Sequence, residues 1–599
     1  MATARVTRGL PRAPMGTEWP TAVGRCAGVS YLPKLRSAAA RRKMCLTPSV
    51  VLFWERRNSP PTLSEAFPNN IISKTLSGQQ HKLLSYRATP IDWSGLDTSK
   101  ESFEECSLIT SAMTALGFYI LMLLGFINQT LFTPKVTSEY DREGYPRLYN
   151  PFDQFYSRYV YRRVRDCWNR PICSAPGAYL TLKDRTSNDY CWTFQYSGTE
   201  TRCVNLGSYN YLGFAEATGE CADAAEKAIH TFGMTLGSPR QELGTSQLHG
   251  QLEELTARFF GVEAAMVVGM GFATNSLGLP AILGPGCLAI SDERNHASLI
   301  LGLRLSNATV KVFRHNDMPH LEEVVRSSIV AGRGKAGEPW LPWKKIFIVV
   351  EGVYSMEGSV VNLPQVMAVK RKYNCYLYLD EAHSVGAMGK RGRGVTDYYG
   401  VDPLEVDVLM GTFTKSFGSA GGYIAGSQKL INCIKKNGHA GVYAKSMSPP
   451  VVQQIISSMS IIMGLQGGDQ GATRIAALAR NTRYFRRRLH QMGVICYGHQ
   501  DSPVVPMLVY LYSKIGCVVR ELSASGVAVV GVGFPATPLL MGRIRFCLSA
   551  AHSREELDSC LDAIQAMADR VGLAYSSKFV NKSELYQRFL DYFSIVLLL

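Results

Sequence analysis

The 15 cysteines of this 599-residue chain form no Cys-x-x-Cys pair and no cluster with histidine at the spacing of a zinc site. The sequence therefore predicts no metal centre, and such scattered cysteines are typical of reduced thiols in a protein that faces the cytosol. Neither Gly334-Lys335 nor Gly389-Lys390 is followed by Ser or Thr, so the chain lacks the phosphate loop of P-loop NTPases. This absence excludes the helicase interpretation that the letters Asp380-Glu-Ala-His383 would otherwise suggest.

Positive charge is in excess, but it is unevenly distributed along the chain. The formal net charge is +16, and residues 1–60 alone hold eleven Lys/Arg against two Glu. Because over half of the excess lies in this leading segment, we predict that the chain does not function by binding nucleic acid. The alternative is nucleic-acid binding through the basic segment, and deleting residues 1–60 would discriminate between the two.

Residues 1–100 have little hydrophobic periodicity and are rich in Pro, Ser, Arg and Gly. This composition predicts a basic N-terminal extension of low order. The Arg-rich and acid-poor start also resembles a transit peptide. An alternative first exon would have the same composition, so these interpretations stay open.

One long hydrophobic run interrupts the chain, from Leu108 to Ile127. Its 20 residues carry no charge, and this length is enough to cross a bilayer core of roughly 30 Å. A buried core helix is the alternative, but the position between a polar extension and a folded domain favours a single membrane anchor. Glu101, Glu104 and Glu105 precede the run and basic residues follow it, so the positive-inside rule puts the downstream domain in the cytosol.

From about Val204, short apolar runs alternate with helix-like stretches. The strand-like runs are 264–268, 287–290, 310–313, 346–350, 375–379 and 406–410. Strands separated by helices predict an α/β fold, with a mostly parallel sheet flanked by helices. Ligands of such sheets bind at the carboxyl ends of the strands.

The same patterns predict how the chain is divided. The predicted segments are a basic extension (1–100), a transmembrane helix (108–127), a linker and N-terminal segment (128–203), a large cofactor-binding domain (204–429), a smaller C-terminal α+β domain (430–573) and a tail (574–599). The end of the tail is unexpectedly apolar, and no internal repeat is visible.

A lysine motif follows one of the predicted strands. The segment Gly411-Thr-Phe-Thr-Lys415-Ser-Phe-Gly418 comes directly after the run 406–410, and Asp380 and His383 follow the run 375–379. A lysine can form a Schiff base with an aldehyde, and a close carboxylate stabilises a protonated ring nitrogen. These side chains at strand ends therefore predict a site for pyridoxal 5′-phosphate (PLP), whose ring acts as an electron sink.

Three further motifs are consistent with a cofactor beside this lysine. Gly269-Met-Gly271-Phe272-Ala-Thr-Asn275 follows a strand and opens a helix, which suits a phosphate because helix N-terminal N–H groups attract anions. His296 follows another strand and is either a structural histidine or a ring that stacks on the cofactor. Arg543 and Arg545 lie on one face of a predicted strand, where they are either solvated or bind the carboxylate of an amino-acid substrate.

Together these motifs resemble the α-oxoamine synthase family, PLP enzymes that condense an amino acid with an acyl-CoA and release carbon dioxide. The resemblance covers about residues 149–573. Within this family, the segments 411–418, Tyr209-Asn-Tyr-Leu-Gly213 and Pro535-Ala-Thr-Pro538 are similar to the catalytic long-chain-base subunits of serine palmitoyltransferase, which also carry an anchor before the enzyme domain. The resemblance implies PLP-dependent transferase fold type I.

The resemblance also implies which positions contact the cofactor. Lys415 would be the Schiff-base lysine and the catalytic base, and Asp380 would pair with the pyridine nitrogen. His383 would contact the phenolate oxygen, and His296 would stack on the ring. The phosphate and the ring oxygen would be contacted by Gly271, Phe272, Thr412 and Ser355.

The substrates implied by the resemblance are L-serine and palmitoyl-CoA, and the products are 3-ketosphinganine, CoA and carbon dioxide. Arg545 would take the serine carboxylate, and Tyr209 and Asn210 would lie where acyl-CoA enters. The loop Pro535–Pro538, with Thr537, would close over the substrate. Two alternatives stay open: a glycine-using relative such as aminolevulinate synthase, and a non-catalytic scaffold subunit, which would lack the lysine.

A partner and a location follow from the same resemblance. The partner would be a lysine-lacking sister subunit in a heterodimer or larger complex. A single span would hold the chain in the endoplasmic reticulum membrane, with the catalytic domain in the cytosol. Tyr443-Ala-Lys-Ser-Met-Ser-Pro-Pro450 resembles the segment that related dimers extend toward the neighbouring site, with an ordinary Ser/Pro turn as the alternative. Leu236-Gly-Ser-Pro239 and Gly533 depart from the family pattern, which leaves substrate preference open.

Overall fold

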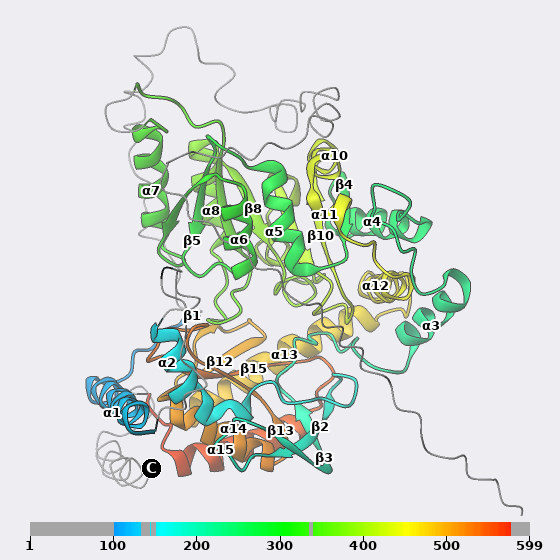
Figure 1. Ribbon diagram of the computed structural model, residues 1–599. Helices are drawn as coiled ribbons and strands as arrows, with labels where there is room; N and C mark the ends of the chain where they lie inside the picture. The colour runs from blue at the N-terminus through cyan, green and yellow to red at the C-terminus, as the bar shows by residue number, and fades with distance from the viewer. Residues whose placement is uncertain (1–100, 133–143, 145–150, 335–338, 577–599) are drawn as a thin grey trace, which may run out of the picture. The chain divides into compact units, whose positions relative to one another are not determined.

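The computed structural model describes residues 101–132, 144, 151–334 and 339–576 (Figure 1). The predicted extension 1–100 and all of the predicted tail beyond residue 576 lie outside the described residues. So do the basic residues that follow the apolar run, Lys135, Arg142 and Arg147.

A seven-stranded sheet forms the centre of the large domain, with the strand order β4-β10-β9-β8-β7-β5-β6. Its strands are β4 (Ala264–Val268), β5 (Leu288–Asp292), β6 (Thr309–Phe313), β7 (Ile346–Glu351), β8 (Tyr376–Asp380), β9 (Val408–Thr412) and β10 (Gly422–Gly426). Within this sheet β10 runs antiparallel to β4 and β9, and the other pairs are parallel. The predicted mostly parallel sheet is therefore confirmed.

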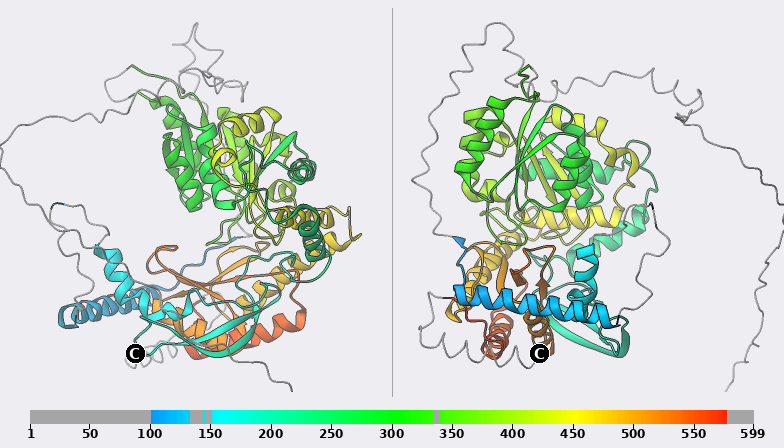
Figure 2. Two further views of the ribbon diagram at one scale, coloured as in Figure 1. Left: turned by 45° about the vertical axis from the view of Figure 1, so that its right-hand side comes forward. Right: turned by 60° about the vertical axis from the view of Figure 1, so that its left-hand side comes forward.

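Helices cover both faces of this sheet (Figures 1 and 2). One core layer contains residues of α5 (Gly271–Ile282), α6 (Ala297–Leu305) and α10 (Gln428–Asn437). The other contains residues of α4 (Gln247–Phe260), α7 (Met318–Ala331) and α8 (Leu363–Tyr373). Within β7, Phe347 belongs to the first layer and Ile348 to the second, as the two-residue period of a strand requires. Burial on both faces explains why these strands are continuous apolar runs.

A smaller domain follows, built on the antiparallel sheet β12-β15-β14. Its elements are β12 (Val504–Tyr510), β14 (Val530–Val532), β15 (Gly542–Cys547), α13 (Gln470–Gln491), α14 (Tyr512–Ala524) and α15 (Arg554–Val571). A second small sheet joins β13 (Val527–Ala528) to the hairpin of β2 (Tyr179–Thr186) and β3 (Gln195–Asn205). Part of the segment predicted as a linker thus pairs with the C-terminal domain, and the predicted boundaries remain predictions.

The described chain has further elements besides these. They are β1 (Glu101–Ser102), which pairs with β11 (Gly498–His499), and the helices α2 (Pro151–Tyr159), α3 (Glu220–Phe232), α9 (Val395–Tyr399), α11 (His439–Tyr443) and α12 (Pro449–Ile462).

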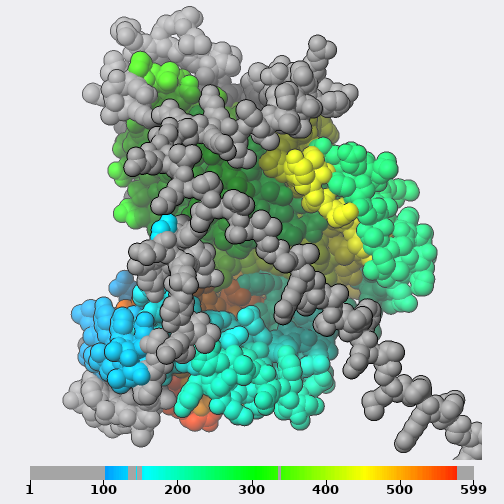
Figure 3. All heavy atoms as spheres, viewed as in Figure 1, coloured from blue at the N-terminus to red at the C-terminus, as the bar shows by residue number. Residues whose placement is uncertain are grey.

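The segment around Pro239, which follows α3, and the segment around Lys445, which precedes α12, lie side by side although they are distant in the sequence. Pro239 and Lys445 form an isolated β-bridge between them. Figure 3 shows the surface around α11 next to that of α3 and α4. Met234, Leu243 and Tyr443 are exposed on these two segments, so an apolar surface includes part of the predicted interface segment.

The predicted apolar run forms α1 (Leu108–Phe132), which extends beyond the predicted end at Ile127. Residues Leu108–Leu131 are long and apolar enough to cross a membrane. One face of the helix packs on the protein, where Phe118 is buried and Gly125 lies against Phe155. Only 22% of its most apolar window is buried, which is consistent with a single span and unlike a core helix (Figure 2).

Arg486 connects α13 to the chain that enters β12. Its buried guanidinium donates hydrogen bonds to the carbonyl oxygens of Tyr497 at 2.9 Å, Ser502 at 3.3 Å and Val504 at 2.6 Å. Burial lowers the pKa of Arg486 to about 10, so the guanidinium stays charged at neutral pH.

We expect Arg486→Met to reduce the free energy of unfolding by about 3 kcal/mol, because it leaves buried carbonyl groups without their donors. Arg487→Met is the matched control, since Arg487 is the next residue of the same helix and is exposed. Thermal unfolding of the purified variants should show a lower Tm for Arg486→Met alone. Equal Tm values for the two variants would contradict this role.

Candidate active site

The carboxyl ends of three neighbouring strands bring the predicted site together. Glu351 ends β7, Asp380 ends β8 and Thr412 ends β9. Glu351 and Asp380 are paired across the sheet, and Lys415 lies in the turns that follow β9. The sheet therefore collects the predicted lysine and aspartate at one edge, as a parallel topology requires.

Lys415 is an amine enclosed by protein and flanked by carboxylates. Burial lowers the pKa of its ammonium group to about 8, although the charges of Asp380 and Glu351 act in the opposite direction. Its Nζ atom lies 5.6 Å from the centre of the Tyr209 ring. An amine with this pKa is partly deprotonated near neutral pH, so it can act as a nucleophile and as a base.

Asp380 is held in place by two hydrogen-bond donors. Asn275 donates through its side-chain amide to one carboxylate oxygen at 2.7 Å, and the backbone N–H of Ala382 donates to the other at 2.9 Å. The hydroxyl of Tyr378 donates to the Asn275 carbonyl oxygen at 2.8 Å, which orients the amide. A fixed carboxylate at this place can pair with a protonated pyridine nitrogen.

Two histidines line the same edge. The Tyr211 hydroxyl lies 2.8 Å from His383 Nδ1, and the Tyr209 ring meets the imidazole edge-on at 4.8 Å. Burial lowers the pKa of His383 well below its usual range, and the charge of Lys415 acts in the same direction. Burial also lowers the pKa of His296, whose Nδ1 lies 2.7 Å from Ser298 Oγ. Both imidazoles are therefore neutral at physiological pH.

A narrow cradle lies where α5 begins. A Cβ atom added to Gly271 would lie 2.7 Å from Thr412 Oγ1, so only glycine leaves this space open. Thr412 Oγ1 donates to the Gly421 carbonyl oxygen at 2.9 Å and lies 2.8 Å from Thr414 Oγ1. The Phe272 ring, exposed at its other side, is 6.0 Å from the ring of His296. The helix N-terminus and these hydroxyls suit a phosphate, so the residues present fit PLP.

Arg545 brings a cation from the small domain to the site. Its guanidinium lies over the Tyr209 ring at 4.5 Å, and its Nη1 is 3.8 Å from the Met356 sulfur. Among the described residues no carboxylate forms an ion pair with it. Arg543 instead forms an ion pair with Glu357 at 3.5 Å. This difference favours Arg545 over Arg543 as the group that meets a substrate carboxylate.

Other predicted residues lie at the margin of the site, and their roles stay predictions. The Asn210 amide donates to the Pro176 carbonyl oxygen at 3.3 Å and accepts from the Ala215 N–H at 3.2 Å, so it also supports the backbone. Ser355 is half-buried in the turn after β7. Thr537 is 4% exposed in the loop before β15, and its hydroxyl has no hydrogen-bond partner among the described residues.

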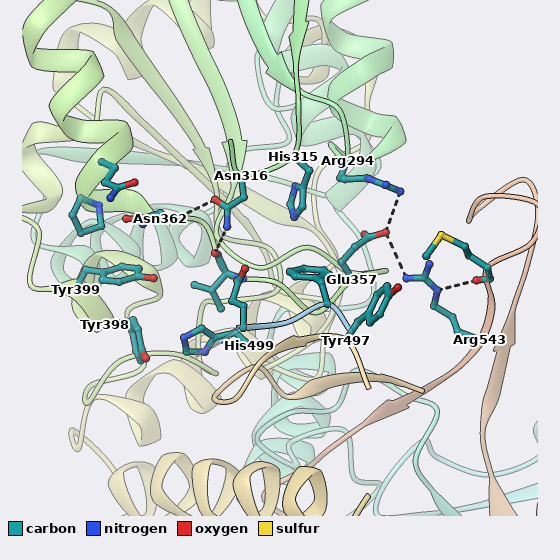
Figure 4. Close-up of a pocket in the computed structure, with 16 residues that line it drawn as sticks. Arg294, His315, Asn316, Glu357, Asn362, Tyr398, Tyr399, Tyr497, His499 and Arg543 are labelled. Atoms are coloured by element: carbon teal, nitrogen blue, oxygen red, sulfur yellow. Dashed lines mark hydrogen bonds and ion pairs between the residues drawn. The ribbon is translucent and has the colours of Figure 1, made fainter. Parts of the chain in front are cut away.

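A cavity of about 760 Å³ lies beside the turn that follows β7, and Glu357 of that turn lines it (Figure 4). Glu357 stands in its wall between two arginines, with Arg294 at 3.3 Å and Arg543 at 3.5 Å. Arg543 also donates to the Met356 carbonyl oxygen at 2.8 Å. These bonds tie the turn that carries Ser355 and Met356 to β15, so the cavity wall helps to position the site.

The fold and the lysine-centred site define a class of PLP-dependent enzymes. Residues 201–564 match the family described as aminotransferase class I and II. A solved serine palmitoyltransferase with PLP superposes with a TM-score of 0.60 at 25% identity, and the match covers 71% of this chain and all of that one. The chain belongs to this class, and PLP is its cofactor.

Relatives with a higher sequence identity than this solved structure identify the family within the class. The chain is 49% identical to serine palmitoyltransferase 3 of Homo sapiens over 494 residues, which cover 81% of this chain and 89% of the relative. It is 48% identical to serine palmitoyltransferase 2 of Caenorhabditis elegans, over 81% and 87% of the two chains. It is 47% identical to long chain base biosynthesis protein 2a of Oryza sativa subsp. japonica, over 78% and 95%. The chain therefore belongs to the serine palmitoyltransferase family and is a PLP-dependent acyltransferase.

Two positioning residues were missed by the sequence reasoning. Asn275 is the last residue of the glycine motif and lies one helical turn after Gly271. Because residues four apart share a helix face, this spacing could have predicted that Asn275 lies on the same side of α5 as Gly271. Tyr211 and His383 are 172 positions apart in the sequence, and no local sequence pattern predicts their contact.

We expect Tyr211→Phe to lower the affinity for PLP about tenfold, because His383 loses its partner in a buried environment. Titrating the PLP-free protein with PLP and following the visible absorbance measures the affinity. Tyr423→Phe is the control, since the buried Tyr423 hydroxyl has no hydrogen-bond partner among the described residues. The positioning role would be refuted by equal affinities in the two variants.

Proposed function

We propose that this chain condenses L-serine with palmitoyl-CoA, or a similar long-chain acyl-CoA, to give 3-ketosphinganine, CoA and carbon dioxide. The observation that carries the proposal is Lys415, a buried amine with a pKa of about 8, at the strand edge to which Arg545 brings a cation. The names of the relatives support it, because they refer to serine, to palmitoyl transfer and to long-chain-base biosynthesis.

Each side chain has a task in this reaction. PLP, when bound, supplies the electron sink that lets a carbanion form at the amino-acid α-carbon. Arg545 binds the serine carboxylate through its planar guanidinium. Lys415 Nζ takes the α-proton, which its lowered pKa allows at neutral pH. Asp380, which accepts hydrogen bonds from the Asn275 amide and the Ala382 N–H, would pair with the protonated nitrogen of the PLP ring.

The bonds balance when one proton is taken up from the solvent, because both the product α-carbon and the CoA thiolate gain a proton and only one is removed from serine. The new bond joins the serine α-carbon to the acyl carbonyl carbon, and the thioester C–S bond breaks to release CoA. The carboxylate that Arg545 holds leaves as carbon dioxide, and a proton returns to the α-carbon. His296 and His383 remain neutral throughout because burial disfavours their charged forms.

Two alternative functions, a non-catalytic scaffold and a glycine-using enzyme, have less support. A non-catalytic scaffold would not need a lysine at position 415. A glycine-using relative such as an aminolevulinate synthase is disfavoured by eight relatives of this chain, which carry serine palmitoyltransferase or long-chain-base names.

A membrane location belongs to the same proposal. α1 is the single helix of the described residues that could cross a bilayer. We place it in the endoplasmic reticulum membrane with the catalytic domain in the cytosol, where serine and acyl-CoA are available. Recovery of the intact protein in the soluble fraction after carbonate extraction would contradict this part.

A sister subunit is the proposed partner. Met270 and Phe272, 60% and 42% exposed, stand at the mouth of the phosphate cradle. Tyr443, 78% exposed, lies on the neighbouring segment. Large apolar side chains beside a cofactor site suit a second protein chain that completes the site.

Product analysis tests the function directly. The chain is co-expressed with its sister subunit, incubated with serine or glycine and with acyl-CoA of several lengths, and the lipids are identified by mass spectrometry. We expect 3-ketosphinganine from serine and palmitoyl-CoA, and no product from the Lys415→Ala variant. A glycine-derived product alone, or full activity in Lys415→Ala, would refute the proposal.

Arg545→Lys should raise the KM for serine at least tenfold and leave PLP binding unchanged. A lysine keeps the charge but loses the bidentate fork that matches a carboxylate. Steady-state kinetics with serine as the varied substrate measures the effect, and the absorbance of bound PLP reports the control. An unchanged KM would move the carboxylate site away from Arg545.

A further inference from the structure

The loop Pro535–Pro538 is bordered by aromatic rings from the N-terminal part of the enzyme. Phe534, the residue before it, meets Phe152 edge-on at 6.0 Å and Tyr156 edge-on at 5.2 Å. Both partners lie one helical turn apart on α2. Edge-to-face pairs of this kind stabilise a contact beyond the area they bury.

A second set of rings holds the entrance of the loop. Tyr512 packs edge-on against Tyr156 at 5.7 Å and stacks on Trp168 at 5.8 Å. A Cβ atom added to Gly533 would lie 2.7 Å from the Tyr512 ring. Glycine at 533, a departure from the family pattern, is therefore the residue that lets Tyr512 pack here.

The loop is closed on itself by backbone hydrogen bonds. The N–H groups of Ala536 and Thr537 donate to the Gly533 carbonyl oxygen at 3.0 and 3.3 Å, and the Met541 N–H donates to Pro538 at 3.0 Å. These three amides report whether the loop is ordered, because they exchange with solvent when it opens.

Neighbouring positions of α2 contact the apolar helix α1. Phe126 of α1 stacks on Phe155 at 4.3 Å. A Cβ atom at Gly125 would lie 2.7 Å from Phe155 and 3.0 Å from Tyr159, so the two helices are in close contact there. α1 and α2 lie side by side in Figures 1 and 2. Helix α2 thus contacts both α1 and the residue that precedes the loop.

We propose that α2 is the positioning element of the substrate loop and that α1 holds α2 in place, which gives the apolar helix a role beyond anchoring. The loop's contact with acyl-CoA rests on the proposed function above. A loop that is ordered before the substrate arrives loses less conformational freedom on binding. Loosening α2 should therefore raise the KM for acyl-CoA more than the KM for serine.

The test uses the membrane-bound holoenzyme with its sister subunit and three variants. Phe152→Ala removes the contact with Phe534, and Phe126→Ala removes the contact of α1 with Phe155. Tyr119→Ala is the control, because Tyr119 is a 69% exposed ring on α1 that packs against Phe118 of the same helix. Hydrogen exchange of the amides at 536, 537 and 541 is measured without substrate, and both KM values are measured with it.

We expect exchange at the three amides to rise roughly two- to tenfold in Phe152→Ala, the range that one aromatic pair supplies. The KM for acyl-CoA should rise by a similar factor, with the KM for serine and the absorbance of bound PLP unchanged. Phe126→Ala should show the same pattern, and Tyr119→Ala should match the unmodified protein. Phe152→Tyr, which keeps the ring, should restore both readings.

Unchanged exchange in Phe152→Ala overturns the proposal, whatever the substrate is. Unchanged exchange in Phe126→Ala alone overturns the part assigned to α1. Faster exchange with both KM values unchanged supports α2 as the positioning element and refutes the loop's contact with acyl-CoA, so the two claims fail separately. If Phe152→Ala does not fold, Phe152→Leu replaces it, because leucine keeps the apolar volume and removes the ring.

Discussion

The rest of the site depends on keeping one amine, that of Lys415, out of water beside carboxylates. Burial lowers the pKa of this amine, and the negative charges of Asp380 and Glu351 act to raise it. Their balance puts the pKa at about 8. Burial also lowers the pKa of His383 and of His296, so the same physical effect acts on the lysine and on both histidines.

The fold supplies this enclosure by ending its strands at one edge. Residues 351, 380 and 412 meet because β7, β8 and β9 are parallel neighbours. The small domain adds Arg545 through β15, and the turn that carries Met356 and Glu357 connects the two domains. The aromatic contacts around α2 connect the same small domain to the apolar helix α1. The catalytic groups and the apolar helix α1 are thus connected through packed side chains.

Much of this arrangement could be predicted from the sequence, because strands buried on both faces are continuous apolar runs and catalytic residues follow them directly. The strand β10 was not predicted, since its five residues begin and end with glycine and carry little β-branched character. Tyr211 was missed because its contact with His383 is made only by folding. The choice between Arg543 and Arg545 depends on Glu357, which is distant in the sequence. Roles assigned to Ser355, Asn210 and Thr537 remain predictions.

The most direct test of this account is the ionisation of Lys415 itself. In the PLP-free protein, competitive labelling with an amine reagent at a series of pH values, followed by peptide mass spectrometry, gives the pKa of that one amine. The account predicts a midpoint near 8, and a lower midpoint in Asp380→Asn, because that carboxylate raises the value. A midpoint at the ordinary lysine value of about 10.4, or no change in Asp380→Asn, would contradict it.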